Sequence, residues 1–180
     1  MKYDYLVNVV ADLYEEIGIK EFGFDLEYVI KKLDINLIPY TAYEGNKDIL
    51  IKFDQDGFSL INPNTSKIEI YYNDQIEPKA RLKFTLSHEL GHVVLGHNLN
   101  GVNETDTMKE QADMFAKIFY CPQAFIIKYK LLTISDLVSN FGITKSYADV
   151  LLQKFRRRKD KSLSQAERRL IDVFEKNKLK

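Results

Sequence analysis

Residues 87–97 read Ser87-His88-Glu89-Leu90-Gly91-His92-Val93-Val94-Leu95-Gly96-His97. Within this stretch His88, Glu89 and His92 form an H-E-x-x-H pattern, and residues four apart on a helix lie one above the other on the same face. Two imidazoles placed in this way can share one tetrahedral zinc ion. Glu89 lies about 100° round the helix from His88, where it can take a proton from a metal-bound water without being a ligand. The pattern therefore predicts a zinc site with Glu89 as its general base.

The same stretch belongs to a predicted amphipathic helix that runs from about residue 80 to residue 96. Its polar side carries Thr85, His88, Glu89, His92 and Gly96. Its apolar side carries Leu86, Leu90, Val93 and Val94. This division suits a helix that packs on a core and turns its polar face into a cleft. The alternative, an ordinary buried helix, would bury two histidines and a glutamate without partners, which costs free energy.

The third protein ligand must come from outside this helix. A metzincin site would need glycine at position 95 and histidine at position 98, but Leu95 and Asn98 stand there. On a continuous helix His97 points about 180° away from His88, so we expect His97 to be a residue of the helix C-terminus and not a ligand.

A second helix is predicted over residues 107–120, with Phe115 on its core face and acidic residues on the opposite side. We expect Glu110 on this helix to be the third ligand. Asp113, one turn further on, would orient one of the histidines by hydrogen bonding. The alternative is that both residues are ordinary solvated acids, which is the usual state of helix carboxylates.

The composition excludes several classes of protein. The 180 residues carry a formal net charge of zero, so no overall field attracts the chain to nucleic acid or to a membrane surface. Cys121 is the single cysteine, which excludes an internal disulfide and any multi-cysteine zinc site. The charged first residues do not form a signal peptide, and no apolar run is long enough to span a bilayer. We therefore expect a cytoplasmic protein with no membrane partner.

The hydrophobic periodicity predicts an α+β fold. Helices are expected over residues 3–17 and 25–33, and the metal helix follows a group of short β-like runs. These runs cover residues 36–40, 49–53, 57–61 and 67–72. They predict a small mixed or antiparallel sheet packed against helices that include the H-E-x-x-H helix. The outer edge of the sheet could hold an extended peptide by β-augmentation, or could simply cap the core.

An all-helical part is predicted to follow the sheet and the metal helix. We expect a zincin-like metallopeptidase core over residues 1–125 and a helical region over residues 126–180, within one continuous domain. Residues 133–156 have the pattern of a helix-turn-helix, and Ser164 with Glu167 forms a capping box for a last helix. The basic run Arg156-Arg157-Arg158-Lys159 with Lys161 would suit phosphates, but cations at a helix end also favour the helix dipole. We expect no DNA partner.

Three motifs in order along the chain resemble one known family. The first is Phe84-Thr85-Leu86-Ser87-His88-Glu89-Leu90-Gly91-His92. The second is Gln111-Ala112-Asp113-Met114-Phe115-Ala116, followed by Pro122. The third is Ile134-Ser135-Asp136-Leu137-Val138 with Phe141-Gly142-Ile143-Thr144. These motifs resemble the ImmA/IrrE family of metallopeptidases. A leading helical segment and the strand and Arg81 before the motif helix also fit that family, so the resemblance covers about residues 20–155.

The resemblance implies a gluzincin-like site in which two histidines and a glutamate bind Zn²⁺. It also implies a cytosolic, site-specific endopeptidase, because known members cleave helix-turn-helix repressors of phages, mobile elements or stress regulons. The family usually places its ligand glutamate three residues before the alanine of the second motif, where this chain has Lys109. The acid follows one residue later at Glu110. The remaining alternatives for the third ligand are Asp113, Asp106 and Glu104.

The sequence thus predicts a zinc-dependent endopeptidase with a protein substrate. His88, His92 and Glu110 would bind the metal, Glu89 would be the base, and Tyr72 or Arg81 would stabilise the oxyanion. The alternative interpretation is a non-catalytic protein that keeps the fold and binds a repressor or DNA.

Overall fold

The computed structural model describes residues 3–97, 104–157 and 162–180 of the chain. Internal contacts divide the chain into two compact units. The sheet unit comprises residues 25–116, and the helical unit comprises residues 1–24 together with 117–180. The boundary predicted at residue 125 stays a prediction.

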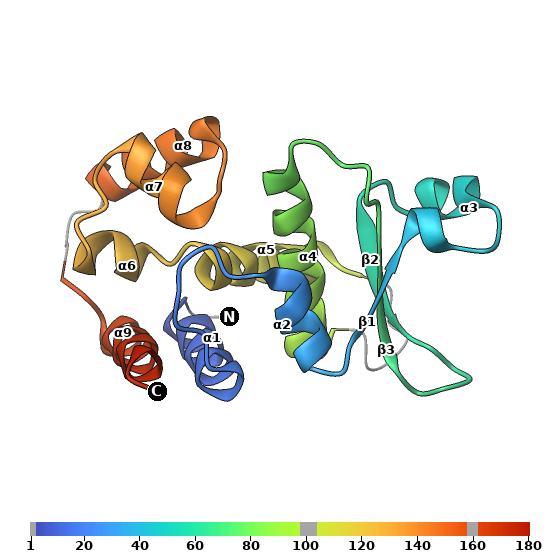
Figure 1. The fold of residues 1–180 in the computed structure, drawn as a ribbon, viewed down its shortest axis with the longest axis horizontal. Coiled ribbons are helices and arrows are strands. Elements are labelled where there is room, and N and C mark those ends of the chain that lie inside the picture. The colour runs from blue at the N-terminus through green and yellow to red at the C-terminus, as the bar shows by residue number, and fades with distance from the viewer. Residues whose placement is uncertain (1–2, 98–103, 158–161) are drawn as a thin grey trace. The chain divides into compact units, whose positions relative to one another are not determined.

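A three-stranded sheet forms one layer of the sheet unit (Figure 1). Its strands are β1 (Asn36–Pro39), β2 (Gly57–Ile61) and β3 (Ile68–Tyr72), in the order β1-β3-β2. β1 runs parallel to β3, and β2 runs antiparallel to it with Ser59 opposite Ile70. The predicted α+β class with a small mixed sheet is confirmed.

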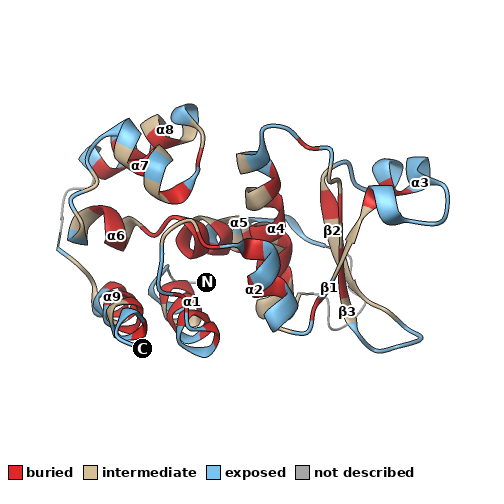
Figure 2. Ribbon diagram, in the orientation of Figure 1, coloured by how far each residue is buried: buried red, intermediate tan, exposed pale blue. Residues whose placement is uncertain are grey.

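Helices pack on this sheet and carry the H-E-x-x-H motif. α4 (Lys79–Val94) packs on β2 and β3, and α2 (Leu26–Lys32) packs on β1 and α4. α5 (Asp106–Tyr120) follows α4 in the chain. Leu86 and Leu90 of α4 are buried, as is Ile70 of β3, so the apolar side of the motif helix faces the core as predicted. Figure 2 shows buried stretches along α4.

The strand predicted over residues 49–53 is wrong. These residues belong to α3 (Lys47–Phe53), which follows the short 3-10 helix η1 (Tyr40–Ala42). The side chain of Asn46 accepts a hydrogen bond from the backbone N–H of Asp48 and so caps α3. Among the apolar residues of α3 that favoured a strand, Ile49, Ile51 and Phe53 are exposed and only Leu50 is buried. The cap therefore outweighs the β propensity of the run.

The helical unit is built from segments at both ends of the chain. It contains α1 (Tyr3–Ile17), the end of α5, α6 (Gln123–Lys128), α7 (Ile134–Phe141), α8 (Lys145–Arg157) and α9 (Gln165–Lys178). α9 packs on α1 and α6, and α7 packs on α8. The predicted all-helical C-terminal part is confirmed, as is the capping box of Ser164 and Glu167 at the start of α9.

A buried amide joins the two segments of the helical unit. Asn177 of α9 is only 2% exposed, and its Nδ2 donates hydrogen bonds to the carbonyl oxygens of Tyr14 and Ile19. Gly142, between α7 and α8, has a left-handed φ of 63°, which ends α7 and makes the predicted helix-turn-helix shape.

Some predicted features lie outside the described residues. These are residues 98–103 of the loop before α5, and Arg158, Lys159 and Lys161 of the basic run. None of the helices in the part of the chain that the structure describes has the length and apolar character needed to cross a bilayer.

Candidate metal centre

The end of α4 determines where the third histidine lies. Gly96 has a left-handed φ of 71°, and the backbone N–H of His97 donates to the carbonyl oxygen of His92 at 2.9 Å. This arrangement ends the helix, because glycine adopts positive φ without steric cost. His97 therefore folds back against His92, with its Nδ1 3.1 Å from Nδ1 of His92.

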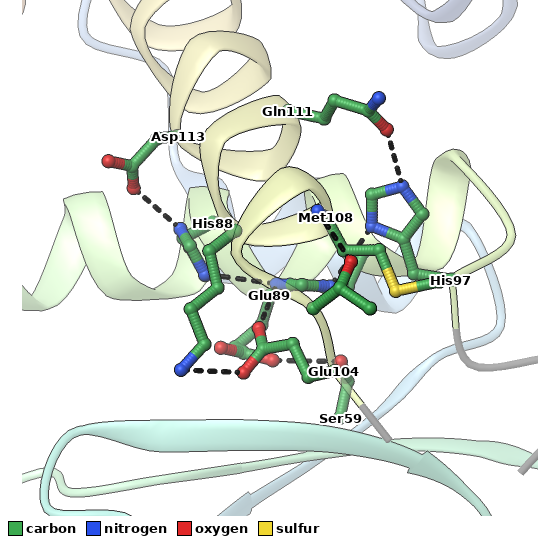
Figure 3. A network of polar contacts seen from close by, with 11 residues as sticks. Ser59, His88, Glu89, His97, Glu104, Met108, Gln111 and Asp113 are labelled. Atoms are coloured by element: carbon green, nitrogen blue, oxygen red, sulfur yellow. Dashed lines mark hydrogen bonds and ion pairs between the residues drawn. The ribbon is translucent and has the colours of Figure 1, made fainter. Parts of the chain in front are cut away.

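Three side chains converge beside this helix end (Figure 3). Nε2 of His92 lies 3.0 Å from Nε2 of His88 and 2.8 Å from Oε1 of Glu104. One donor atom from each of the three residues lies within 4.8 Å of the others. His88 and His92 come from successive turns of α4, and Glu104 precedes α5.

These atoms fit a zinc ion in kind and in spacing. Two imidazole nitrogens and one carboxylate oxygen form a donor set typical of catalytic zinc. Bonds of about 2.0 Å in a tetrahedron place neighbouring donor atoms about 3.3 Å apart, close to the 3.0 Å and 2.8 Å that separate Nε2 of His92 from the donor atoms of His88 and Glu104. Burial, helped by His88 and His97, lowers the pKa of His92 to about 4, so its imidazole is neutral and able to bind a metal at pH 7.

Two further contacts hold the histidines in place. Oδ1 of Asp113 lies 2.8 Å from Nδ1 of His88, and Oε1 of Gln111 lies 3.1 Å from Nε2 of His97. Both partners belong to α5. The Asp113 contact is the one expected of a residue that orients a metal-binding histidine through its second ring nitrogen.

Glu89 lies beside the histidines with its carboxylate held by the sheet. It is 7% exposed, and its Oε2 accepts a hydrogen bond from Oγ of Ser59 on β2 at 2.8 Å. Burial raises the pKa of Glu89 to about 8, the Ser59 hydrogen bond opposes this rise, and the charges of Asp54 and Glu104 add to it. A carboxyl group in this state can both accept and release a proton near neutral pH.

The close approach of α4 and α5 brings these groups together. A Cβ atom added to Gly91 would lie 3.0 Å from the ring of Phe115 and 3.2 Å from the backbone of Ala112. Any larger residue at position 91 would therefore push the helices apart. Gly91 and Ala112 thus allow residues on α5 to reach the histidines of α4.

The other predicted site residues do not belong to the group of three converging side chains. Glu110 and Asp106 are exposed on α5, outside that group. Arg81 forms an ion pair with Asp56 at 2.7 Å, and Tyr72 is buried on β3. Within the described residues neither Arg81 nor Tyr72 makes a hydrogen bond or ion pair with the histidines or Glu89. The roles predicted for Glu110, Arg81 and Tyr72 stay predictions.

Comparison with known families agrees with this geometry. Residues 49–169, more than half of the chain, match the sequence model of the family described as IrrE N-terminal-like domain, Peptidase_M78. The chain belongs to this family. Membership confirms the resemblance found in the motifs and makes this a metallopeptidase-family protein. No curated protein matches the chain.

Within this IrrE-like chain, sequence reasoning missed Ser59 and the contact of His97 with His92. Ser59 is thirty positions from Glu89 and reaches it only through the packing of β2 on α4. The glycine before His97 was the available signal, because Gly96 at a helix end predicts a left-handed turn.

Proposed function

We propose that the protein is a zinc-dependent endopeptidase that acts in the cytoplasm on a helix-turn-helix transcriptional repressor of a phage, mobile element or stress response. The observation that carries the proposal is the convergence of His88 Nε2, His92 Nε2 and Glu104 Oε1 beside the buried carboxyl group of Glu89. Membership of the Peptidase_M78 family supports the same activity.

Some residues of the site would bind the metal ion, and another would transfer the proton of the attacking water. His88, His92 and Glu104 would hold the ion. When bound, zinc supplies a Lewis acid that polarises the scissile carbonyl and makes water a stronger acid. Glu89 accepts the proton of the attacking water and later delivers it to the leaving amine. Ser59 holds the Glu89 carboxylate at 2.8 Å while this proton moves.

The protonation state of Glu89 supports its assignment as the base. Its raised pKa of about 8 results mainly from burial, and a nearby divalent cation favours the ionised form of a carboxyl group. An ion held by His88, His92 and Glu104 would thus keep Glu89 ionised at neutral pH, which is the form that can act as a base. The same burial helps the protonated form to persist until the leaving amine takes the proton.

The proposed substrate rests on the ImmA/IrrE resemblance, because known members of that family cleave helix-turn-helix repressors. Such repressors act in the cytoplasm of the cell that expresses them, which is the reason for the proposed location. The formal net charge of zero gives the chain no general attraction to nucleic acid, so we propose a protein substrate and no DNA partner.

The proposal is tested with the purified chain, zinc and a candidate repressor, with cleavage products identified by mass spectrometry. Glu89→Gln removes the base but keeps the size of the side chain and an acceptor for Ser59. We expect it to lower kcat by about 100-fold to 10,000-fold, with zinc content unchanged. Cleavage by E89Q at the wild-type rate, in a folded and zinc-loaded protein, would show that Glu89 is not the base.

A second candidate function is a protein that binds a repressor without cutting it. The observation behind it is Lys109, which stands where the family usually has its ligand glutamate, and whose Nζ lies 3.1 Å from Oε2 of Glu104. An ammonium group at this position competes with a metal ion for Glu104. Metal content and thermal unfolding with added zinc separate the two functions, because binding to the native state raises its stability.

A further inference from the structure

We propose that His97 and Gln111 are positioning residues that determine which ring nitrogen of His92 carries the proton. They thereby control whether Nε2 of His92 can bind a metal ion. This inference rests on the metal centre of the proposed function and concerns the regulation of that site.

The contacts form a series of hydrogen bonds that starts at Gln111 on α5 and ends at the metal-binding nitrogen of His92. Oε1 of Gln111 lies 3.1 Å from Nε2 of His97. Nδ1 of His97 lies 3.1 Å from Nδ1 of His92. The second ring nitrogen of His92, Nε2, lies 3.0 Å from Nε2 of His88 and 2.8 Å from Oε1 of Glu104.

The chemistry of these groups fixes the protons along the chain. A carbonyl oxygen only accepts, so Nε2 of His97 carries a hydrogen when it faces Oε1 of Gln111. The Nδ1 atom of a neutral His97 is then bare, and it accepts a hydrogen bond from Nδ1–H of His92. Nε2 of His92 is left with a free electron pair.

The same logic applies to the other histidine. The carboxylate of Asp113 accepts from Nδ1–H of His88, at 2.8 Å, and leaves Nε2 of His88 bare. The bare Nε2 of His92 then lies 3.0 Å from the bare Nε2 of His88 and 2.8 Å from the carboxylate oxygen of Glu104, with no hydrogen on either nitrogen. Electron pairs so close together repel, and a divalent cation between them removes the repulsion. In this state the site is ready for metal.

Gln111 can also support the opposite state, because its amide group has both a donor and an acceptor. If the amide rotates, its NH₂ donates to Nε2 of His97, and Nδ1–H of His97 donates to Nδ1 of His92. Nε2 of His92 then carries the hydrogen and donates it to Oε1 of Glu104, 2.8 Å away. In this second state the hydrogen bond between His92 and Glu104 occupies two of the metal ligands, so the site cannot bind a metal ion. Metal binding selects the first state, and the residue at position 111 sets the balance between them.

The test measures zinc affinity by competition with a chelator, using the full chain and four variants. H97L and Q111M remove the chain of hydrogen bonds, and we expect each to bind zinc about 10-fold to 100-fold more weakly than the wild type. H97N places an acceptor oxygen near the position of Nδ1 of His97 and should restore most of the affinity. Q111E accepts but cannot donate, so it should bind zinc at least as tightly as the wild type.

Nitrogen chemical shifts of the His92 ring in zinc-free protein report the proton position directly. We expect the proton on Nδ1 in Q111E, and a shift toward Nε2 in H97L and Q111M. Circular dichroism and thermal unfolding in chelator establish that each variant is folded. These readouts separate positioning from a structural role, which would make Q111E and Q111M equally harmful.

Wild-type zinc affinity and unchanged His92 chemical shifts in both H97L and Q111M would overturn the positioning role of His97 and Gln111 but would leave the metal centre intact. A loss of affinity in Q111E equal to that in Q111M would also overturn it. Failure of the wild-type protein to bind zinc would overturn both the metal centre and the positioning role of His97 and Gln111.

Discussion

The backbone of α4 at Gly91 lies directly against the backbone of α5 at Ala112. A methyl group at position 91 would come within 3.2 Å of the Ala112 Cα and carbonyl oxygen. Glycine within a helix normally costs stability, so its position here reflects the contact between the helices and not helix propensity. This contact determines how far Asp113 and Gln111 lie from the histidines.

Gly91→Ala is therefore expected to destabilise the protein by roughly 1–3 kcal/mol, because backbone atoms of α5 cannot move aside as a flexible side chain would. Denaturant unfolding measures the change. The sign is informative, since the same substitution in an uncrowded helix would stabilise by roughly 0.4–1 kcal/mol. A stabilised G91A protein would mean that the two helices are further apart than described.

Ser59→Ala is expected to lower kcat/KM by about 10-fold to 100-fold, because hydrogen bonds to charged groups contribute about 1.5–3 kcal/mol. Ser59 donates to Oε2 of Glu89 and orients it. S59T keeps the hydroxyl group and serves as the matched variant. Zinc content should be the same in both variants, and equal activity of S59A and wild type would remove Ser59 from the mechanism.

Glu104→Gln is expected to weaken zinc binding, whereas Glu110→Gln should leave it nearly unchanged. Glu104 places a carboxylate oxygen 2.8 Å from Nε2 of His92, whereas Glu110 is exposed. Zinc titration and the rise in melting temperature on adding zinc measure both variants. The opposite pattern would return the third-ligand role to Glu110.

Cys121 is expected to resist thiol reagents in the native protein. The side chain is 3% exposed, and burial raises the pKa of the Cys121 thiol far above its usual range. The thiolate is the form that reacts with thiol reagents. Between pH 7 and pH 9 the native protein should therefore be labelled roughly 100-fold or more slowly than the unfolded chain. Rapid labelling of the folded protein at pH 8 would contradict this burial.

The parts of the fold that depend on local pattern were predictable. The metal helix was expected over residues 80–96 and spans Lys79–Val94, and β2 spans residues 57–61 as expected. Here the hydrophobic period and the turn residues agree. In α3 the apolar run favours a strand and the Asn46 cap favours a helix, and the structure shows that the helix forms.

The candidate site was predictable where its residues lie on one helix. His88, Glu89 and His92 keep a fixed geometry on α4, whatever the rest of the chain does. The contacts from other segments, from Ser59 and Glu104, depend on how β2 and the start of α5 meet α4, and local spacing contains no such information. His97 was expected to point away from His88 because the helix was extended through Gly96, whereas the left-handed φ of Gly96 turns His97 back toward His92.

Asn177 has a consequence for the order in which the polypeptide is assembled on the ribosome. Its amide joins α9 to the end of α1, so the helical unit cannot close until α9 has emerged. Residues 25–116 are contiguous, and domains fold as units in the order of their synthesis. The sheet unit contains every residue of the candidate metal centre. It can therefore fold before α9 has been synthesised and packed on α1.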